Sequence, residues 1–245
     1  MTSSPTTQET LAREPIGGQT VRSAGRAGRR PLALVGGLAV AVATALALVA
    51  LAVPLFLNPV WVGFEQERSR ADAFTGYSLP ELHAVTGSLL HDLVVGPGAF
   101  DATDASGRPV LSERERAHLR DVRAVFGVAL AVAVASVAIV MVGGIVGRSR
   151  PGFWRAVRLG AGGLAVAVVA LGAVALVAFD AAFELFHRLF FAAGSYTFDP
   201  RTDRLVQLFP DQFWSETTIL LGLVLLLLAW DVRRFAGRRA ARLSG

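Results

Sequence analysis

Four long apolar runs, at residues 32–57, 124–146, 159–179 and 213–230, constrain the fold of this chain more than any other feature of its sequence. About 20 apolar residues in a helix cross the roughly 30 Å of hydrocarbon in a bilayer. An open-ended segment inside the bilayer must satisfy its backbone hydrogen bonds within itself, which only a helix does. The runs therefore predict an all-α integral membrane protein with four transmembrane helices.

Composition agrees with this fold class. Apolar residues make up 53% of the chain and the mean hydropathy is +0.51, which is more than a soluble core absorbs. The fourth run contains Glu216, and we expect Trp214 and Trp230 to anchor it at the bilayer interfaces. The small residues at 50–52 resemble a signal-peptide cleavage site, but the first apolar run is too long for a signal peptide.

The charges between the runs alternate in sign. Arginine exceeds acid in residues 1–31 (five Arg, two acids), 147–158 (four Arg, no acid) and 231–245 (five Arg, one acid). Acid exceeds arginine in residues 58–123 (ten acids, seven Arg) and 180–216 (six acids, three Arg). Because basic loops stay in the cytoplasm, we expect both termini inside and structured extracytoplasmic segments at 58–123 and 180–212.

Three regions follow from this topology. Residues 1–31 have no apolar periodicity and should form a disordered, Arg-rich cytoplasmic tail. We expect residues 32–231 to form a single membrane domain and residues 232–245 a basic cytoplasmic tail. The arginines behind the net charge of +5 flank the apolar runs, so membrane lipids and not nucleic acid are the expected partners.

The first outer segment should have structure of its own, because helix connections usually need only about 2–8 residues. Apolar side chains recur there at helical spacing, at Leu82, Val85, Leu89 and Leu93. This pattern predicts an amphipathic helix on the outer leaflet. Further on, Ser112 and Glu115 have the spacing of a capping box that opens a helix leading into the second run.

All four histidines lie in the two outer segments. His83 and His91, eight residues apart on the predicted surface helix, do not have the spacing of a compact metal-ligand pair. The chain has no cysteine, so thiolate catalysis and Cys-ligated metals are excluded. We therefore expect no metal site and assign no catalytic role to His83 or His91.

The other two histidines lie beside carboxylates. His118 is about one turn outside the second run, and Asp121 follows on the same helical face, where it could orient the imidazole. The alternative is a solvated, charged helix start without chemistry.

In the second outer segment one helical stripe carries Asp180, Glu184, His187 and Phe191, on a helix expected to continue from the third run. Ionisable groups at a membrane interface are costly, which favours a functional site. The alternative is an interfacial anchor with snorkelling polar groups.

Five short motifs stand in a fixed order around the apolar runs. They are Glu115-Arg-Ala-His118-Leu-Arg-Asp121-Val-Arg123, Phe186-His187-Arg-Leu-Phe190-Phe191, Phe198-Asp199-Pro200, Asp203-x-Leu205 and Phe209-Pro210-x-x-Phe213-Trp214. Together they resemble the bacterial four-span membrane proteins that include the lipoprotein intramolecular transacylase. One departure is Tyr196, at a position where the family resemblance leads us to expect tryptophan.

The resemblance implies an enzyme that moves the sn-2 acyl chain of a diacylglyceryl-modified lipoprotein onto the α-amine of its N-terminal cysteine. It also implies that His118 and His187 are catalytic. The residues expected to support them are Asp121, Glu184, Asp180, Arg123 and Asp199. The alternatives are a non-catalytic membrane protein that binds lipid or a partner through its outer segments, and a different acyltransferase or lipid hydrolase.

The residues suit this chemistry. An α-amine with a pKa of about 7.7–8.0 needs a base to become nucleophilic, and imidazole is suited to that proton transfer. A second histidine or an arginine could stabilise the oxyanion. Amine and ester belong to one molecule, so no enzyme nucleophile or cofactor is required. We expect His187, oriented by Glu184 or Asp180, to be the base and His118, backed by Asp121, to serve the oxyanion, or the reverse.

Overall fold

The computed structural model describes residues 29–245. Its elements are α2 (Arg29–Ala52), the 3-10 turn η1 (Val53–Leu55), α3 (Pro59–Arg68), α4 (Ala71–Thr75), α5 (Leu79–Val94), α6 (Glu113–Gly147), α7 (Pro151–Val177), α8 (Phe179–Phe190), α9 (Arg204–Leu208) and α10 (Asp211–Arg242). Extended pairing within residues 29–245 is limited to one bridge between Thr103 and Pro109. The all-α prediction is confirmed.

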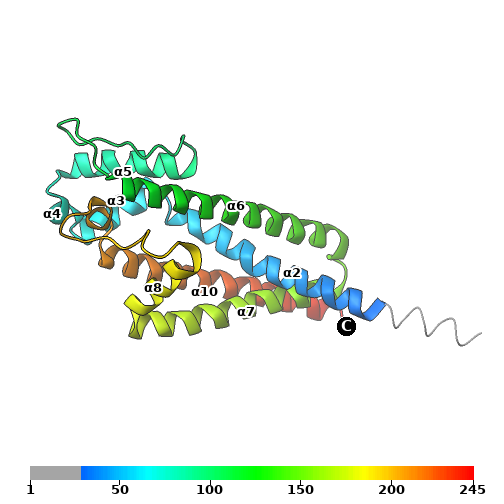
Figure 1. Cartoon of the computed structure of the whole chain (residues 1–245). Helices are drawn as coiled ribbons and strands as arrows, with labels where there is room; N and C mark the ends of the chain where they lie inside the picture. Colours follow the sequence, from blue (N-terminus) through cyan, green and yellow to red (C-terminus); the bar gives the residue numbers. More distant parts are fainter. Residues whose placement is uncertain (1–28) are drawn as a thin grey trace, which may run out of the picture.

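Most of the expected disordered tail lies outside the described residues. Its last three residues, 29–31, are already helical, because α2 begins at Arg29. Figure 1 shows α2, α6, α7 and α10 running lengthwise in an elongated bundle, with the shorter helices gathered at one end. The beginning of α2 and the carboxyl terminus lie at the opposite end.

Within residues 29–245, three helical segments are long and apolar enough to cross a membrane: Leu34–Leu55, Glu113–Gly147 and Pro151–Val177. They contain most of the first three predicted runs. The third helix begins earlier than predicted, at Pro151, because proline is well suited to the first turn of a helix. The fourth run lies inside α10, whose 32 residues pack along α7.

The long helices are held together through small side chains. In the interior of the bundle Ala52, Ala161 and Ala229 alternate with the larger Leu48, Leu164 and Leu225. At Gly160 of α7 an added Cβ would collide with the backbone carbonyl of Ala41 in α2. The two backbones therefore touch there, which is the small-residue packing expected between helices in a membrane.

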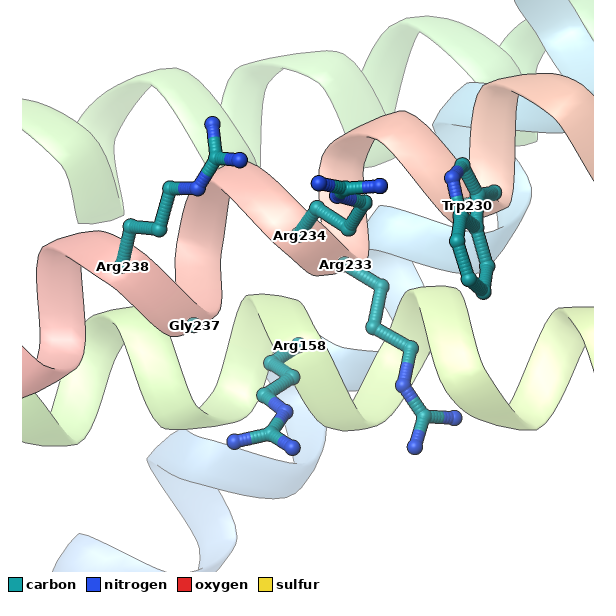
Figure 2. Close-up of a pocket in the computed structure, with 6 residues that line it drawn as sticks. All are labelled: Arg158, Trp230, Arg233, Arg234, Gly237 and Arg238. Atoms are coloured by element: carbon teal, nitrogen blue, oxygen red, sulfur yellow. The ribbon is translucent and has the colours of Figure 1, made fainter.

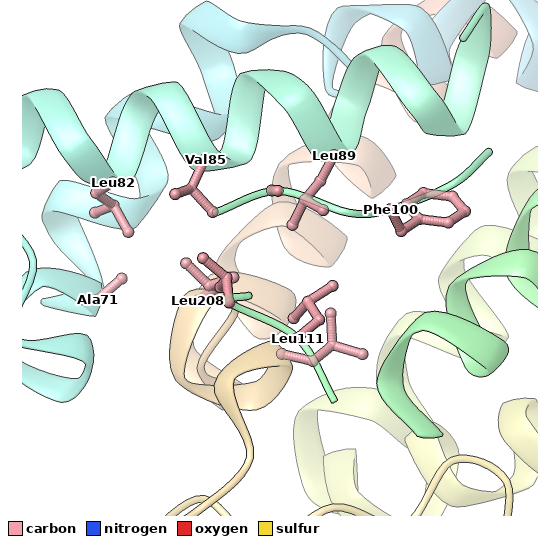
Figure 3. Close-up of a cluster of buried hydrophobic side chains, with 10 residues drawn as sticks. Ala71, Leu82, Val85, Leu89, Phe100, Leu111 and Leu208 are labelled. Atoms are coloured by element: carbon pink, nitrogen blue, oxygen red, sulfur yellow. The ribbon is translucent and has the colours of Figure 1, made fainter. Parts of the chain in front are cut away.

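A second apolar core lies at the end of the bundle that carries the short helices. Figure 3 shows Leu82, Val85 and Leu89 of α5 facing Phe100 and Leu208. The predicted amphipathic helix is thus present as α5, but its apolar face packs against protein, which corrects its predicted place on the outer leaflet. The loop after α5 and helix α9, far apart in sequence, supply the apolar surface that lipid was expected to provide.

The predicted capping box is confirmed. The Ser112 hydroxyl accepts from the Glu115 backbone amide, and one oxygen of Glu115 accepts from the Ser112 amide at 2.7 Å. The other oxygen of Glu115 accepts from the backbone amide of Leu205, also at 2.7 Å. This buried carboxylate therefore fixes the start of α6 against α9, one helical turn before His118.

Replacing Gly160 with valine should destabilise the bundle, because the new side chain would force α2 and α7 apart. We expect the free energy of unfolding to fall by about 1–3 kcal/mol, the usual range for overpacking. Thermal unfolding in detergent, followed by circular dichroism, measures the change. Gly163→Val is the matched control, since a Cβ at Gly163 meets no atom within 4 Å. Equal midpoints for the two variants would contradict the close contact.

Candidate active site

A break between α7 and α8 forms the site. Ala178 has φ −146° and ψ 59°, outside the helical region, so the helix of the third run stops at Val177. Figure 1 shows α8 leaving the axis of α7 at an angle. The predicted continuous helix is therefore wrong at this point: α8 is a separate helix, and the change of direction places His187 beside His118.

The two histidines are buried next to each other at the end of the bundle that carries the short helices. His118 is 6% exposed and His187 is 9% exposed. Their ring centroids are 6.1 Å apart and their planes differ by 27°. The two imidazole rings therefore lie side by side, close enough for one substrate molecule to reach both.

Aromatic rings enclose the pair. Phe191 and Phe198 approach His118 edge-on, with centroids at 4.9 and 5.5 Å. Phe183 and Tyr196 lie on His187 at 4.2 and 5.0 Å. The rings are apolar, so they exclude water and strengthen electrostatic interactions at the imidazoles.

The hydrogen bond of His187 determines which of its nitrogens can act as a base. Its Nδ1 lies 2.8 Å from the carbonyl oxygen of Phe183. A carbonyl oxygen only accepts, so in the neutral ring Nδ1 carries the proton and donates. The Nε2 atom is left with a free lone pair, as a general base requires.

His118 lies in the charged start of α6, before the apolar residues 124–146. Burial, and secondarily the neighbouring His187, lower the pKa of His118 to about 4, and the Asp121 carboxylate opposes this effect. Its buried Nδ1 has no hydrogen-bond partner among the described residues. His118 is therefore a neutral imidazole at pH 7, able to donate one N–H bond to a reacting group.

The structure separates the expected supporting carboxylates from the imidazoles. Asp121 and Asp180 are exposed, and neither has a hydrogen bond to a histidine among the contacts of residues 29–245. Glu184 accepts from Arg188 at 2.8 Å and from the Tyr196 hydroxyl at 3.2 Å. The Phe183 carbonyl thus holds the position next to His187 that we expected a carboxylate to fill.

Two further expected residues support neighbouring loops. The Arg123 guanidinium donates to the backbone carbonyl of Asp92, at the end of α5. Asp199 accepts from the backbone and the side chain of Arg201 in the turn that follows Phe198. Among residues 29–245 neither residue has a hydrogen bond or ion pair with a histidine; both bind the segments around the pair.

Sequence reasoning missed two contributions to the site. Tyr196, noted only as a departure from the expected tryptophan, lies against the His187 ring and reaches Glu184 through its hydroxyl. Asp203 accepts from Arg114 at 2.8 Å and from the Asp199 amide at 2.7 Å. This pairing holds the loop with Phe198 over His118, and it joins positions 89 residues apart, for which the sequence carries no local signal.

The remaining histidines are not part of the pair. His83 lies on α5 with its Nε2 3.5 Å from Glu67, and His91 is exposed near the end of the same helix. Within residues 29–245 no three side chains of the His, Cys, Asp and Glu types are grouped to hold a metal ion.

Comparison with known proteins supports the resemblance seen in the motifs. The family model of the lipoprotein intramolecular transacylase Lit matches residues 38–214. In a comparison with curated protein sequences, no relative matches this chain.

Solved structures show the same fold. The in meso structure of the membrane integral lipoprotein intramolecular transacylase Lit from Bacillus cereus superposes with a TM-score of 0.70 at 20% identity, covering 86% of this chain and 98% of that one. A histidine-to-arginine variant of that protein gives 0.72 at 20% identity, with 91% and 100% covered. A histidine-to-alanine variant gives 0.70, also at 20% identity, with 89% and 99% covered. The family match extends over most of the chain, and the chain therefore belongs to the lipoprotein intramolecular transacylase family.

Proposed function

We propose that this chain transfers the sn-2 acyl chain of a diacylglyceryl-modified lipoprotein to the α-amine of its N-terminal cysteine, with His118 and His187 as the catalytic residues. The observation that carries the proposal is the buried imidazole pair, in which one ring presents a free Nε2 and the other is neutral. Amine and ester are parts of one substrate, so the protein needs only to align them and move protons.

The first step is the activation of the amine. The α-ammonium group releases one proton to solvent, and as the amine nitrogen attacks the ester carbonyl carbon, His187 Nε2 removes a second proton from it. The carbonyl oxygen becomes an oxyanion, to which a His118 N–H donates. A donor fixed in an apolar site before reaction stabilises this charge more than water does.

In the second step the tetrahedral intermediate breaks down. The carbon–oxygen bond to the glycerol breaks, and protonated His187 returns its proton to the departing alkoxide. An amide and a free hydroxyl result, and both imidazoles are again neutral. The aromatic rings around the pair keep out water, which would otherwise attack the ester and release a fatty acid.

The supporting residues act through the loops and helices that they hold. Glu184 positions Tyr196, and through it the ring that lies on His187. Asp121 affects His118 through its charge, and Asp180 adds negative charge to the start of α8. Arg123 and Asp199 stabilise the adjoining loops.

We propose four membrane spans, with the fourth at residues 213–230 of α10, and with both termini in the cytoplasm. Residues 58–123 and 180–212 would then face the outside of the cytoplasmic membrane, where lipoprotein acyl chains are accessible. Helix α6 has 35 residues, or about 52 Å at 1.5 Å per residue, which exceeds the roughly 30 Å of hydrocarbon. Its charged first turns, with His118, can therefore extend beyond the apolar layer.

The grouping of elements in Figure 1 supports this orientation, because the arginine-rich segments and the histidine pair lie at opposite ends of the bundle. On the same grounds we propose one membrane domain, residues 32–231, followed by a basic tail at 232–245. Membrane lipids surround the apolar faces of the long helices, many of whose large side chains are exposed.

Replacing either catalytic histidine with alanine should abolish most of the activity. We expect His187→Ala and His118→Ala to lower the rate by about 10²–10⁴-fold, the usual contribution of acid–base catalysis. The measurement is mass spectrometry of a reporter lipoprotein, coexpressed in a host without other N-acylation. The matched control is His91→Ala, at an exposed position of α5, which should leave the product unchanged.

The same experiment separates the proposal from its alternatives. A wild-type protein that leaves the diacylglyceryl group intact would favour a non-catalytic membrane protein that binds lipid or a partner. Release of free fatty acid without N-acylation would instead indicate a lipid hydrolase. Full activity in both histidine variants would refute the assignment of the pair.

Substitutions of Tyr196 should show that its ring matters more than its hydroxyl. Tyr196→Trp keeps an aromatic face on His187, and we expect activity within about threefold of wild type, while Tyr196→Ala should lose about tenfold or more by opening the site to water. Initial rates on the reporter lipoprotein measure both. Equal activity of the alanine and tryptophan variants would contradict a role for the ring.

His118 should stay neutral through the physiological pH range. Because burial lowers its pKa to about 4, its imidazole NMR signals should be constant from pH 8 down to about 5 and should shift only near pH 4. In the unfolded chain the same group takes up a proton near pH 6.5, so its contribution to stability decreases as the pH falls from 6.5 towards 4. A folded-state transition near pH 6.5, assigned by comparison with His118→Gln, would contradict the buried neutral ring.

A further inference from the structure

A basic groove lies between α7 and α10, at the end of the bundle opposite the histidine pair. Figure 2 shows Arg158 of α7 next to the part of α10 that carries Arg233, Arg234 and Arg238, with Arg158 and Arg233 extending to one side and Arg234 and Arg238 to the other. Trp230 and Gly237 complete the lining, and the groove has a volume of about 330 Å³. None of the catalytic or supporting residues contributes to it.

The positive charge of the groove is not neutralised within the described part of the chain. None of the ion pairs between residues 29 and 245 includes any of the four lining arginines. The two segments that meet at this end, 147–158 and 231–245, contain nine arginines and one acid, Asp231. Like charges this close repel one another, and an anion between them would relieve the repulsion.

Glycines on both helices give the arginines room. A Cβ at Gly162 of α7 would lie 2.9 Å from Nη1 of Arg233, so the guanidinium of α10 rests against bare backbone of α7. In return, the Arg158 side chain lies across Gly237 of α10, with its Cδ 3.6 Å from the position of a Cβ. Each helix thus accommodates an arginine of the other, and the pairing holds two guanidinium groups beside the groove.

Trp230 places the groove at the boundary between apolar and polar surroundings. The indole is exposed, and the Arg234 guanidinium lies 5.5 Å from its ring centroid. Before Trp230, α10 is continuously apolar from Ile219 to Ala229; after it, arginines predominate. Tryptophan is enriched at this level of a bilayer, where phospholipid headgroups lie.

We propose that this groove is a binding site for the phosphodiester headgroup of an anionic membrane phospholipid. Guanidinium groups form paired hydrogen bonds with phosphate oxygens, and basic pockets between membrane helices are suited to anionic headgroups. The lipid's acyl chains would lie along the exposed apolar faces of α7 and α10, where Leu159 and Leu227 are both more than half exposed. A bound lipid would join the two helices at the end away from the catalytic site.

The test uses the purified full-length protein, with dioleoyl-phosphatidylglycerol binding measured by native mass spectrometry. The double variant Arg158→Gln/Arg233→Gln should bind this lipid about tenfold more weakly, equivalent to about 1.4 kcal/mol. The control Arg148→Gln/Arg242→Gln removes the same charge from the same end without changing the lining, and should stay within about twofold of wild type.

A second pair of variants tests the site without changing any charge. Gly162→Ala should weaken lipid binding because its methyl group displaces Arg233, whereas Gly163→Ala, which meets no atom within 4 Å, should not. Circular dichroism of each variant confirms that the helices are intact.

Three results would overturn the proposal. They are equal binding by the groove variant and wild type, equal affinity for dioleoyl-phosphatidylcholine, and displacement of the lipid by inorganic phosphate at the same concentration. The last outcome would identify a free anion site in place of a lipid site. A preference for phosphatidylglycerol that disappears only in Arg158→Gln/Arg233→Gln and in Gly162→Ala supports the proposal.

Discussion

The Glu115 carboxylate joins two parts of the chain that are 90 residues apart, and the geometry around the histidine pair depends on it. One oxygen caps α6, and the other accepts from the backbone amide of Leu205 in α9, which follows the loop over His118. Both oxygens are buried and satisfied, so breaking the bonds would leave a charge without partners in an apolar place. This energetic cost holds the start of α6 and the loop over His118 in a fixed position relative to each other.

The chemistry of the pair follows from this fixed enclosure. A histidine in water would be partly protonated near neutral pH, whereas burial keeps His118 neutral. The Phe183 carbonyl selects the tautomer of His187, and it can do so because it lies one helical turn earlier on α8. Backbone geometry and desolvation therefore replace the carboxylates that usually orient and tune catalytic imidazoles.

The two ends of the bundle carry different kinds of side chains. The imidazole pair, among aromatic rings, occupies one end, and arginines without ion-pair partners in the described chain line a groove at the other. Close backbone contact, as at Gly160, holds α2 and α7 together between them. A lipid bound at the arginine end would stabilise the α7–α10 pair, and α7 leads directly into the break that positions His187.

The sequence by itself determined the helical class, three helices long and apolar enough to span a membrane, and the capping box at Ser112. It also selected His118 and His187, whose catalytic role is a proposal. These features are local, because apolar run length and capping chemistry are set by neighbouring residues. The fourth span, predicted from an apolar run, and the orientation, predicted from charge, remain proposals. Tertiary structure alone decided the contact between His118 and His187, the break at Ala178, the packing of α5 against protein and the place of Tyr196. Each of these features depends on surfaces that distant segments of the chain supply, because those surfaces remove water from some side chains and leave others exposed. A local sequence pattern cannot predict which side chains they will cover.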